Sequence, residues 1–346
     1  MKPRQSRRAL SDNSKATVGI AAGIFVLLYL LLTLVSPISA TSFIINNFIV
    51  LTTPLAFAAS GVTLVLLIGG FDLSVAGSIS LSNVIAATTM AAHPHSSWGI
   101  ACLVLVMGAV IGLVNGVCVA VFGLPALGVT LSTNFILAGI ALAVLPAPGG
   151  SVPAAFASVL SGTIGGTIPV ALLALVGFSL LWLLFIKSRT GMSALAIGGD
   201  VKAARLSGIA VRRVQIVVYA LAGLCYAAAG LYFSALTATG SPTSGSSFLL
   251  TAFAAAALGF VSFRGGRGSA IGAIFGAATL TVIPKFLFAW GIADFWVGAF
   301  QGLVILVALT IPWLTTKIAG LRKRDGEEVT VGSGPTQSIS AMAETA

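Results

Sequence analysis

Long apolar segments recur along this sequence and constrain its fold more than any other feature. Runs of eighteen or more apolar residues are frequent, and each is long enough to cross the roughly 30 Å of hydrocarbon in a bilayer as an α-helix. With 58% hydrophobic and only 8% charged residues, a soluble domain could not cover its surface. The 40 glycines suit helices whose backbones pack closely in lipid. The sequence therefore predicts an all-α, polytopic integral membrane protein.

The apolar segments predict ten transmembrane helices. The ten predicted spans are residues 17–35, 44–68, 76–92, 98–121, 126–145, 167–186, 216–236, 248–263, 270–288 and 295–314. Pro54 and Gly61 can kink or break the second span. The chain is thus organised as a basic tail over residues 1–16, a membrane domain over 17–315 and a polar tail over 316–346, which is expected to be disordered.

The positive charge of the chain is concentrated between the spans. Of the 18 basic residues, 17 lie in four clusters, within residues 1–15, 187–213, 264–267 and 317–324. Ten spans with a cytoplasmic amino terminus place every cluster and both termini inside, whereas nine or eleven spans would put at least one cluster outside. The positive-inside rule then accounts for the net charge of +10. The expected partner is therefore anionic membrane lipid and not nucleic acid.

The residues that catalysis or metal binding would need are missing. The sequence has no G-x-x-x-x-G-K-[ST] phosphate loop. Its two histidines, His93 and His95, lie in one short loop without a third ligand, which makes a metal site improbable on composition alone. Cys102, Cys118 and Cys225 fall inside predicted spans and are interpreted as small buried apolar residues. We expect no catalytic residue, no metal and no cofactor.

One long polar interval, residues 188–215, interrupts the apolar pattern. Asp200 to Ser207 predicts a short helix, which Asp200 can cap at its amino end and Gly208 can terminate. Eight residues span only about 12 Å, so this helix cannot cross a bilayer and must lie at its surface. A simple connector between two spans would satisfy the same pattern.

Several motifs, in order along the chain, are similar to those of one transporter family. They are GGFDLSVAGS from Gly69, GLVNGVCVAVFGLPALGVTLST over 112–133, AARLSGI followed by a basic pair, GGRGSAIGAIFGA and FWVGAFQGLVILVAL. Over roughly residues 44–315 the chain resembles the permease subunits of sugar-type ABC importers, the ribose and related monosaccharide family. Branched-chain amino acid permeases are relatives of that family and tend to carry Asn where this chain has Asp72.

The resemblance implies a bacterial cytoplasmic-membrane protein that translocates a monosaccharide. It implies two separate ATPase subunits that hydrolyse ATP, an extracytoplasmic solute-binding protein and a second permease copy, identical or not. The short helix would then be the coupling helix that sits in a groove of the ATPase. The residues expected to couple to the ATPase are Gly199, Asp200, Lys202, Ala203, Ala204, Arg205, Leu206, Ser207 and Gly208.

Polar side chains within the spans are candidates for the substrate pathway. Amides, hydroxyls and one carboxylate offer hydrogen bonds to a polar solute, and the candidates are Asn46, Asn47, Asp72, Asn115, Thr130, Thr133 and Asn134. The alternative for each is that the same group holds two helices together. Asp72 is expected at the inner edge of the membrane and Asp294 at the outer edge. Neither forms the mid-membrane carboxylate chain typical of a proton-coupled carrier.

The chain departs from the family pattern at positions that bear on the substrate. FLLTAFAAA replaces a motif that commonly carries two acidic residues, so Leu249 and Thr251 stand in their place. Gly-Phe-Val-Ser-Phe at 259–263 replaces Gly-Gly-Thr-Ser-Leu, and Ala138 replaces an arginine. Two alternatives therefore stay open: a permease for branched-chain amino acids or nucleosides, and an ion-coupled secondary transporter.

Overall fold

The computed structural model describes most of the chain. It covers residues 3–292 and, beyond them, positions 296, 298–300, 302, 303, 306 and 310, with side chains from Lys15 onward. The predicted tenth span at 295–314 lies largely outside the described residues. Asp294 and the predicted tail at 316–346 lie wholly outside them.

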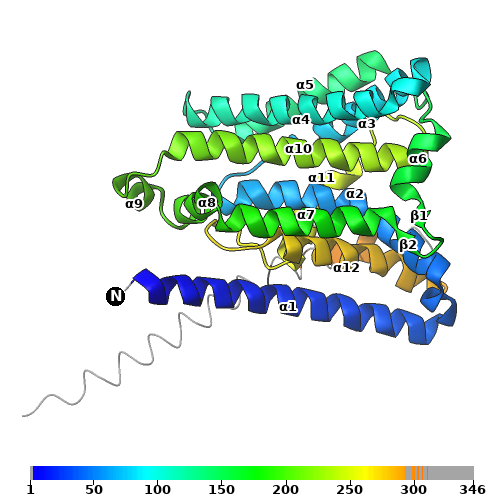
Figure 1. Cartoon of the computed structure of the whole chain (residues 1–346), viewed down its shortest axis with the longest axis horizontal. Coiled ribbons are helices and arrows are strands. Elements are labelled where there is room, and N and C mark those ends of the chain that lie inside the picture. Colours follow the sequence, from blue (N-terminus) through cyan, green and yellow to red (C-terminus); the bar gives the residue numbers. More distant parts are fainter. Residues whose placement is uncertain are drawn as a thin grey trace, which may run out of the picture.

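Among the described residues, eight helices are long and apolar enough to cross a bilayer, and they lie side by side in a bundle (Figure 1). These eight are α1 (Pro3–Val35), α2 (Ser42–Leu67), α3 (Val75–Ala92), α4 (Ser97–Ala120), α5 (Ala126–Val144), α7 (Val170–Lys187), α10 (Val211–Thr237) and α12 (Ala270–Ala289). Each contains most of one predicted span, because long apolar runs can be recognised without tertiary information. The chain is an all-α, polytopic membrane protein, and the count of ten spans stays a prediction.

The predicted span at 248–263 is helical over only part of its length. Its helix, α11 (Ser246–Leu258), has 13 residues and is about 20 Å long. The helix ends because the chain meets α12 at close range: a Cβ on Gly259 would lie 2.6 Å from the Gly272 carbonyl oxygen. The next residue, Phe260, adopts φ +57°, which an L residue seldom adopts.

Short elements connect the long helices at both ends of the bundle. They are η1 (Pro37–Ala40), η2 (Pro94–Ser96), α6 (Ala154–Ser161), β1 (Thr163–Ile164), β2 (Ile168–Pro169), α8 (Arg189–Gly199) and α9 (Val201–Leu206). β1 and β2 pair antiparallel, with Ile164 opposite Ile168. α8 was not predicted, because its sequence is too polar to be recognised as a span and was interpreted only as part of the 188–215 interval.

The centre of the bundle is formed by α2, α3 and α10. In the most apolar 18 residues of each helix, 83% of the residues of α2 are buried, compared with 11% in α1 and 17% in α5. The outer helices expose their leucines, valines and isoleucines on a surface that lipid would cover. α2 continues through Pro54 without a break. Gly61 does not break it either, because this glycine makes room for the ring of Tyr226, which would lie 2.5 Å from a Cβ there.

The two ends of the bundle differ in charge. α8, α9 and the start of α1 lie at one end, and α6 with the β1–β2 hairpin lies at the other (Figure 1). The loop that holds Arg264 and Arg267 belongs to the first end, since Gly266 N–H donates a hydrogen bond to the Leu67 carbonyl at 2.9 Å. We call this first end the basic end. It gathers three of the four predicted basic clusters, as the parity argument requires.

Candidate functional site

α9 (Val201–Leu206) is one residue shorter at each end than the helix predicted over 200–207, and Asp200 caps it as predicted. Asp200 is extended, with φ −161° and ψ 111°, and its Oδ1 accepts hydrogen bonds from the backbone N–H groups of Lys202 at 2.8 Å and Ala203 at 3.1 Å. At the other end Gly208 has φ +78°. Ile209 N–H then reaches back to the Ala204 carbonyl at 3.1 Å, which completes a Schellman-type termination. Local capping thus defines a six-residue helix at the basic end.

The nine candidate coupling residues divide into one buried residue and eight exposed ones. Ala204 is 4% exposed and packs into the main hydrophobic core of the bundle. The exposed residues are Gly199, Asp200, Lys202, Ala203, Arg205, Leu206, Ser207 and Gly208. Leu206 is 90% exposed, an uncommon state for a leucine at the tip of a surface helix. Ala204 therefore anchors α9 to its own chain and does not face outward, where a partner protein could approach it closely.

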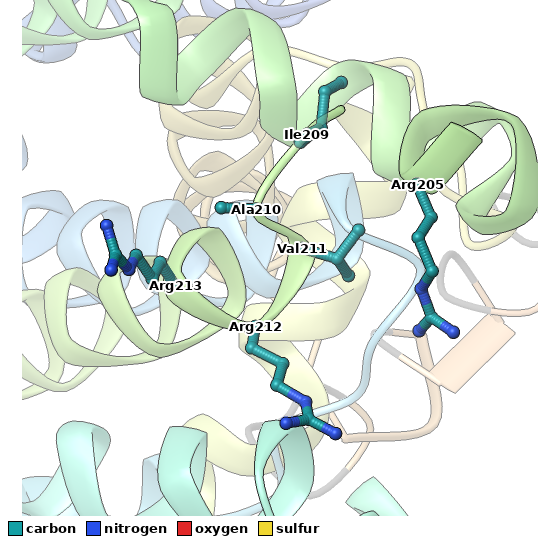
Figure 2. Close-up of a pocket in the computed structure, with 6 residues that line it drawn as sticks. All are labelled: Arg205, Ile209, Ala210, Val211, Arg212 and Arg213. Carbon is teal, nitrogen blue, oxygen red and sulfur yellow. The ribbon is translucent and has the colours of Figure 1, made fainter. Parts of the chain in front are cut away.

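A shallow depression of about 430 Å³ lies where α9 meets α10. It is lined by Arg205, Ile209, Ala210, Val211, Arg212 and Arg213. Arg205 and Arg212 extend in the same direction, whereas Arg213 points away from both (Figure 2). Residues 15–292 hold only two carboxylates, Asp72 and Asp200, and Asp72 is buried. The surface around the depression therefore carries positive charge that is largely uncompensated.

A buried hydrogen-bond network joins several of the pathway candidates behind this surface. Asp72 Oδ1 accepts from Ser74 N–H at 2.9 Å and from Ser74 Oγ at 2.6 Å. Ser74 Oγ in turn accepts from Asn115 Nδ2 at 3.0 Å, and Asn115 Oδ1 accepts from Thr133 Oγ1 at 2.6 Å. We call these four residues the Asp72 network. It ties the turn between α2 and α3 to both α4 and α5.

The electrostatics of Asp72 follow from its burial in this turn between two spans. Its side chain is 1% exposed, and this burial raises the pKa of the carboxyl from 3.8 to about 6, while the hydrogen bonds from Ser74 lower it. The Tyr226 hydroxyl from α10 also lowers this pKa, although it does not complete a hydrogen bond. Asp72 Oδ2 is left without a partner.

The other pathway candidates do not join the Asp72 network. Asn134 Oδ1 accepts from Gly77 N–H at 2.7 Å and so ties α5 to α3 separately. Thr130 is buried and bonds only to the Ala126 carbonyl of its own helix at 2.8 Å. Asn46 and Asn47 lie near the start of α2, about 30 Å along the helix from the Asp72 turn. The structure therefore brings together three of the seven predicted residues in one network, with Asn134 beside them.

Sequence reasoning missed a second polar cluster, near the middle of α3. Asn83 Nδ2 donates to Ser234 Oγ at 2.8 Å, and Asn83 Oδ1 accepts from Ser241 N–H at 2.7 Å. Ser80 Oγ accepts from Gly245 N–H at 2.9 Å. The signal was present, because a largely buried span with several Ser and Asn residues needs polar partners from elsewhere. Within the described residues, no three His, Cys, Asp or Glu side chains gather as a metal site would require.

Comparison with known proteins assigns this membrane bundle to a family. The model of the family described as branched-chain amino acid transport system / permease component matches residues 44–309. The chain belongs to this permease family. The permease is a multi-pass protein of the cytoplasmic membrane, and α8, α9 and the Asp72 network all lie within the matched region.

Individual relatives cover most of the permease. It is 37% identical to the probable ABC transporter permease protein y4mJ of Sinorhizobium fredii over 75% of this chain and 78% of that protein. It is 32% identical to the ribose import permease protein RbsC of Escherichia coli over 82% of this chain and 91% of that protein. The galactose/methyl galactoside import permease protein MglC of Escherichia coli is 29% identical over 88% of this chain and 97% of that protein. No solved structure matches the chain.

Proposed function

We propose that the permease is the membrane-spanning subunit of an ATP-binding-cassette importer that moves a monosaccharide into the cytoplasm. This chain matches nearly the whole length of relatives named for ribose and galactose import, which supports a sugar as the transported solute. The family description names branched-chain amino acids, so an amino acid is the second candidate. ATP hydrolysis takes place on separate ATPase subunits, and an extracytoplasmic solute-binding protein delivers the sugar. The permease works as a pair of copies.

The single observation that carries the ATPase interaction is the exposure of Leu206 beside Lys202 and Arg205. A leucine that is 90% exposed on a capped, anchored helix gains free energy when a partner covers it. The basic side chains around it favour an acidic rim on that partner. The basic end is then cytoplasmic, and the end with α6 and the β1–β2 hairpin faces the solute-binding protein. The predicted span at 295–314 returns the chain to the cytoplasm as the tenth crossing.

In this proposal the Asp72 network closes the cytoplasmic end of the pathway, and we call this contact the inner closure. The network does not serve as a sugar site. Asp72 and Asn115 are buried, and the four members are linked to one another by hydrogen bonds, with Asp72 Oδ2 left unpaired. A solute would reach these groups only after the contacts between the Asp72 turn, α4 and α5 had opened. Asn46 and Asn47, near the other end of the bundle, remain candidates for the outer part of the pathway.

Reconstituted transport tests the proposed function. The permease is placed in liposomes with its ATPase subunits inside and its solute-binding protein outside, and uptake of labelled ribose, galactose and leucine is measured. We expect ATP-dependent uptake of a monosaccharide and none of leucine. Uptake by the permease alone, driven by an ion gradient without ATP, would contradict the importer and favour a secondary transporter.

A substitution at the tip of α9 tests the interaction with the ATPase. Leu206→Asp should reduce co-purification of the ATPase by roughly ten-fold or more, because it replaces the exposed apolar contact with a charge. The matched control is Ile164→Asp on β1, a residue that is 55% exposed at the opposite end. The control should leave co-purification unchanged. Equal losses in both variants would count against α9 as the contact.

A further inference from the structure

Three segments that are far apart in the sequence meet backbone to backbone at the basic end. They are the end of α2 at Leu67, the last turn of α8 at Gly198, and the loop after α11 at Gly265 and Gly266. The Leu67 carbonyl accepts the Gly266 N–H at 2.9 Å. A Cβ on Gly198 would overlap that same carbonyl and the Gly266 amide nitrogen. We call these three glycines the glycine junction.

Glycine is required at this junction for reasons of space and of backbone geometry. Gly265 and Gly266 adopt φ +88° and +72°, the region where a side chain is strained. A Cβ on Gly265 would also lie 2.8 Å from the Gly198 carbonyl oxygen. No side chain lies between the three backbones, so no rotamer change can absorb a shift of one relative to the others. The contact is therefore stiff.

The junction lies between the two functional regions of the basic end. On one side, Gly198 is two residues before Asp200, which caps α9. On the other side, Leu67 is five residues before Asp72. The turn and the Gly266 loop are also held together by aromatic rings: the Phe71 ring centroid lies 6.2 Å from those of Phe253 and Phe263. The Asp72 network then continues from this turn to α4 and α5.

We propose that the glycine junction transmits movement of α8 and α9 to the Asp72 turn, and so couples ATPase closure to opening of the inner closure. This inference rests on the proposed function. α8 cannot shift against the end of α2 without displacing the Leu67 carbonyl, and the turn that follows carries Asp72. Gly198, Gly265 and Gly266 act as positioning residues, because they touch neither sugar nor ATPase.

A glycine inside the junction and a glycine with open space around it provide the test. Gly198→Ala inserts a methyl group into the junction, whereas Gly177→Ala on α7, the long helix before α8, is the control, since nothing lies within 4 Å of a Cβ on Gly177. Each variant is reconstituted with ATPase subunits and solute-binding protein, and sugar uptake, ATP hydrolysis and ATPase co-purification are measured together. The deciding quantity is the amount of ATP hydrolysed per sugar imported, which a purely structural weakening would not change.

For Gly198→Ala we expect ATPase co-purification near the wild-type level and a roughly ten-fold rise in ATP consumed per sugar. Gly177→Ala should match the wild type in every measurement. If Gly198→Ala imports sugar with the wild-type ATP ratio, the proposal is overturned. If wild type and Gly177→Ala show no ATP-driven uptake, the proposed function itself fails, and this inference falls with it.

A milder variant provides the test if the Gly198→Ala protein does not insert into the membrane. A Cβ on Gly266 would lie 2.9 Å from the Gly199 amide nitrogen, so Gly266→Ala crowds the same junction less severely. It should insert and show the same rise in ATP consumed per sugar. If neither variant inserts, or if Gly266→Ala inserts and stays fully coupled, the junction serves folding alone and the proposal is wrong.

Discussion

Helix α4 is held by its neighbours in two different ways over residues 108–116. On one side Gly108, Gly112 and Gly116 press against the backbone of α10, where a Cβ on Gly112 would overlap the Tyr219 carbonyl oxygen. On another side Asn115 bonds to Ser74 and Thr133. The first contact depends on the absence of side chains, whereas the second depends on hydrogen bonds between side chains.

This difference separates what must stay fixed from what is able to open. Close backbone packing gains dispersion energy over many atoms and tolerates no displacement. A hydrogen bond between helices in a membrane is worth only about 1 kcal/mol, because the opened groups find other partners. We therefore expect the α4–α10 contact to move as one body during transport, and the Asp72 network to be the contact that breaks. The following three predictions test that division.

The largest effect is expected from Gly112→Ala. A methyl group directed at the Tyr219 carbonyl must separate α4 from α10, at a cost of about 3 kcal/mol or more. Membrane abundance and the unfolding temperature in detergent measure the loss. Gly99→Ala is the control on the same helix, since nothing lies within 4 Å of a Cβ there. A Gly112→Ala protein as stable as the control would show that the contact with α10 is loose.

A smaller effect, dependent on pH, is expected from Asp72. Because burial raises the pKa of this carboxyl from 3.8 to about 6, the folded protein binds its proton more tightly than the unfolded chain. Below pH 4 the carboxyl is protonated in both the folded and the unfolded protein, and its burial as the neutral form does not oppose folding. As the pH rises through 6, the unfolded chain releases this proton more readily than the folded protein, so the folded state loses stability. The loss amounts to at most about 3 kcal/mol.

The variant Asp72→Asn isolates this carboxyl from the other titrating groups. Its amide stays neutral, so the difference in unfolding free energy between wild type and variant should grow in favour of the variant between pH 4 and pH 7. Denaturation in detergent at several pH values measures that difference. A difference that is independent of pH would mean that Asp72 is not protonated more readily in the folded state.

The smallest effect is expected from Thr133→Val, which removes the bond from α5 to Asn115. The expected loss is about 1 kcal/mol, too little to prevent insertion. Thr130→Val is its control three residues earlier on α5, because the Thr130 hydroxyl bonds only within its own helix. Unfolding in detergent compares the two variants. Equal destabilisation would contradict a specific role of the Asp72 network between helices.

The local features of this permease could be predicted from sequence because they depend on neighbours along the chain. The apolar runs give the positions of eight spans, and Asp200 and Gly208 give the ends of α9. The residues Asp72, Asn115 and Thr133 were recognised as special, since polar groups within apolar spans need a partner. Their connection through Ser74 could not be predicted, because it joins a turn to two helices that are 41 and 59 positions further along the chain.

Glycines show most clearly where sequence information ends. By itself the sequence determined that this chain is a membrane bundle with one capped helix at its surface, because hydrophobic length and capping are local properties. Only the tertiary structure decided that Gly61 accommodates a tyrosine ring, that Gly112 lies on a carbonyl and that Gly198 belongs to a junction. Only it decided that Ala204 faces inward while Leu206 faces outward. The physical reason is that a glycine or an alanine carries no sign of what approaches it, and that neighbour is supplied by helices folded from distant parts of the chain.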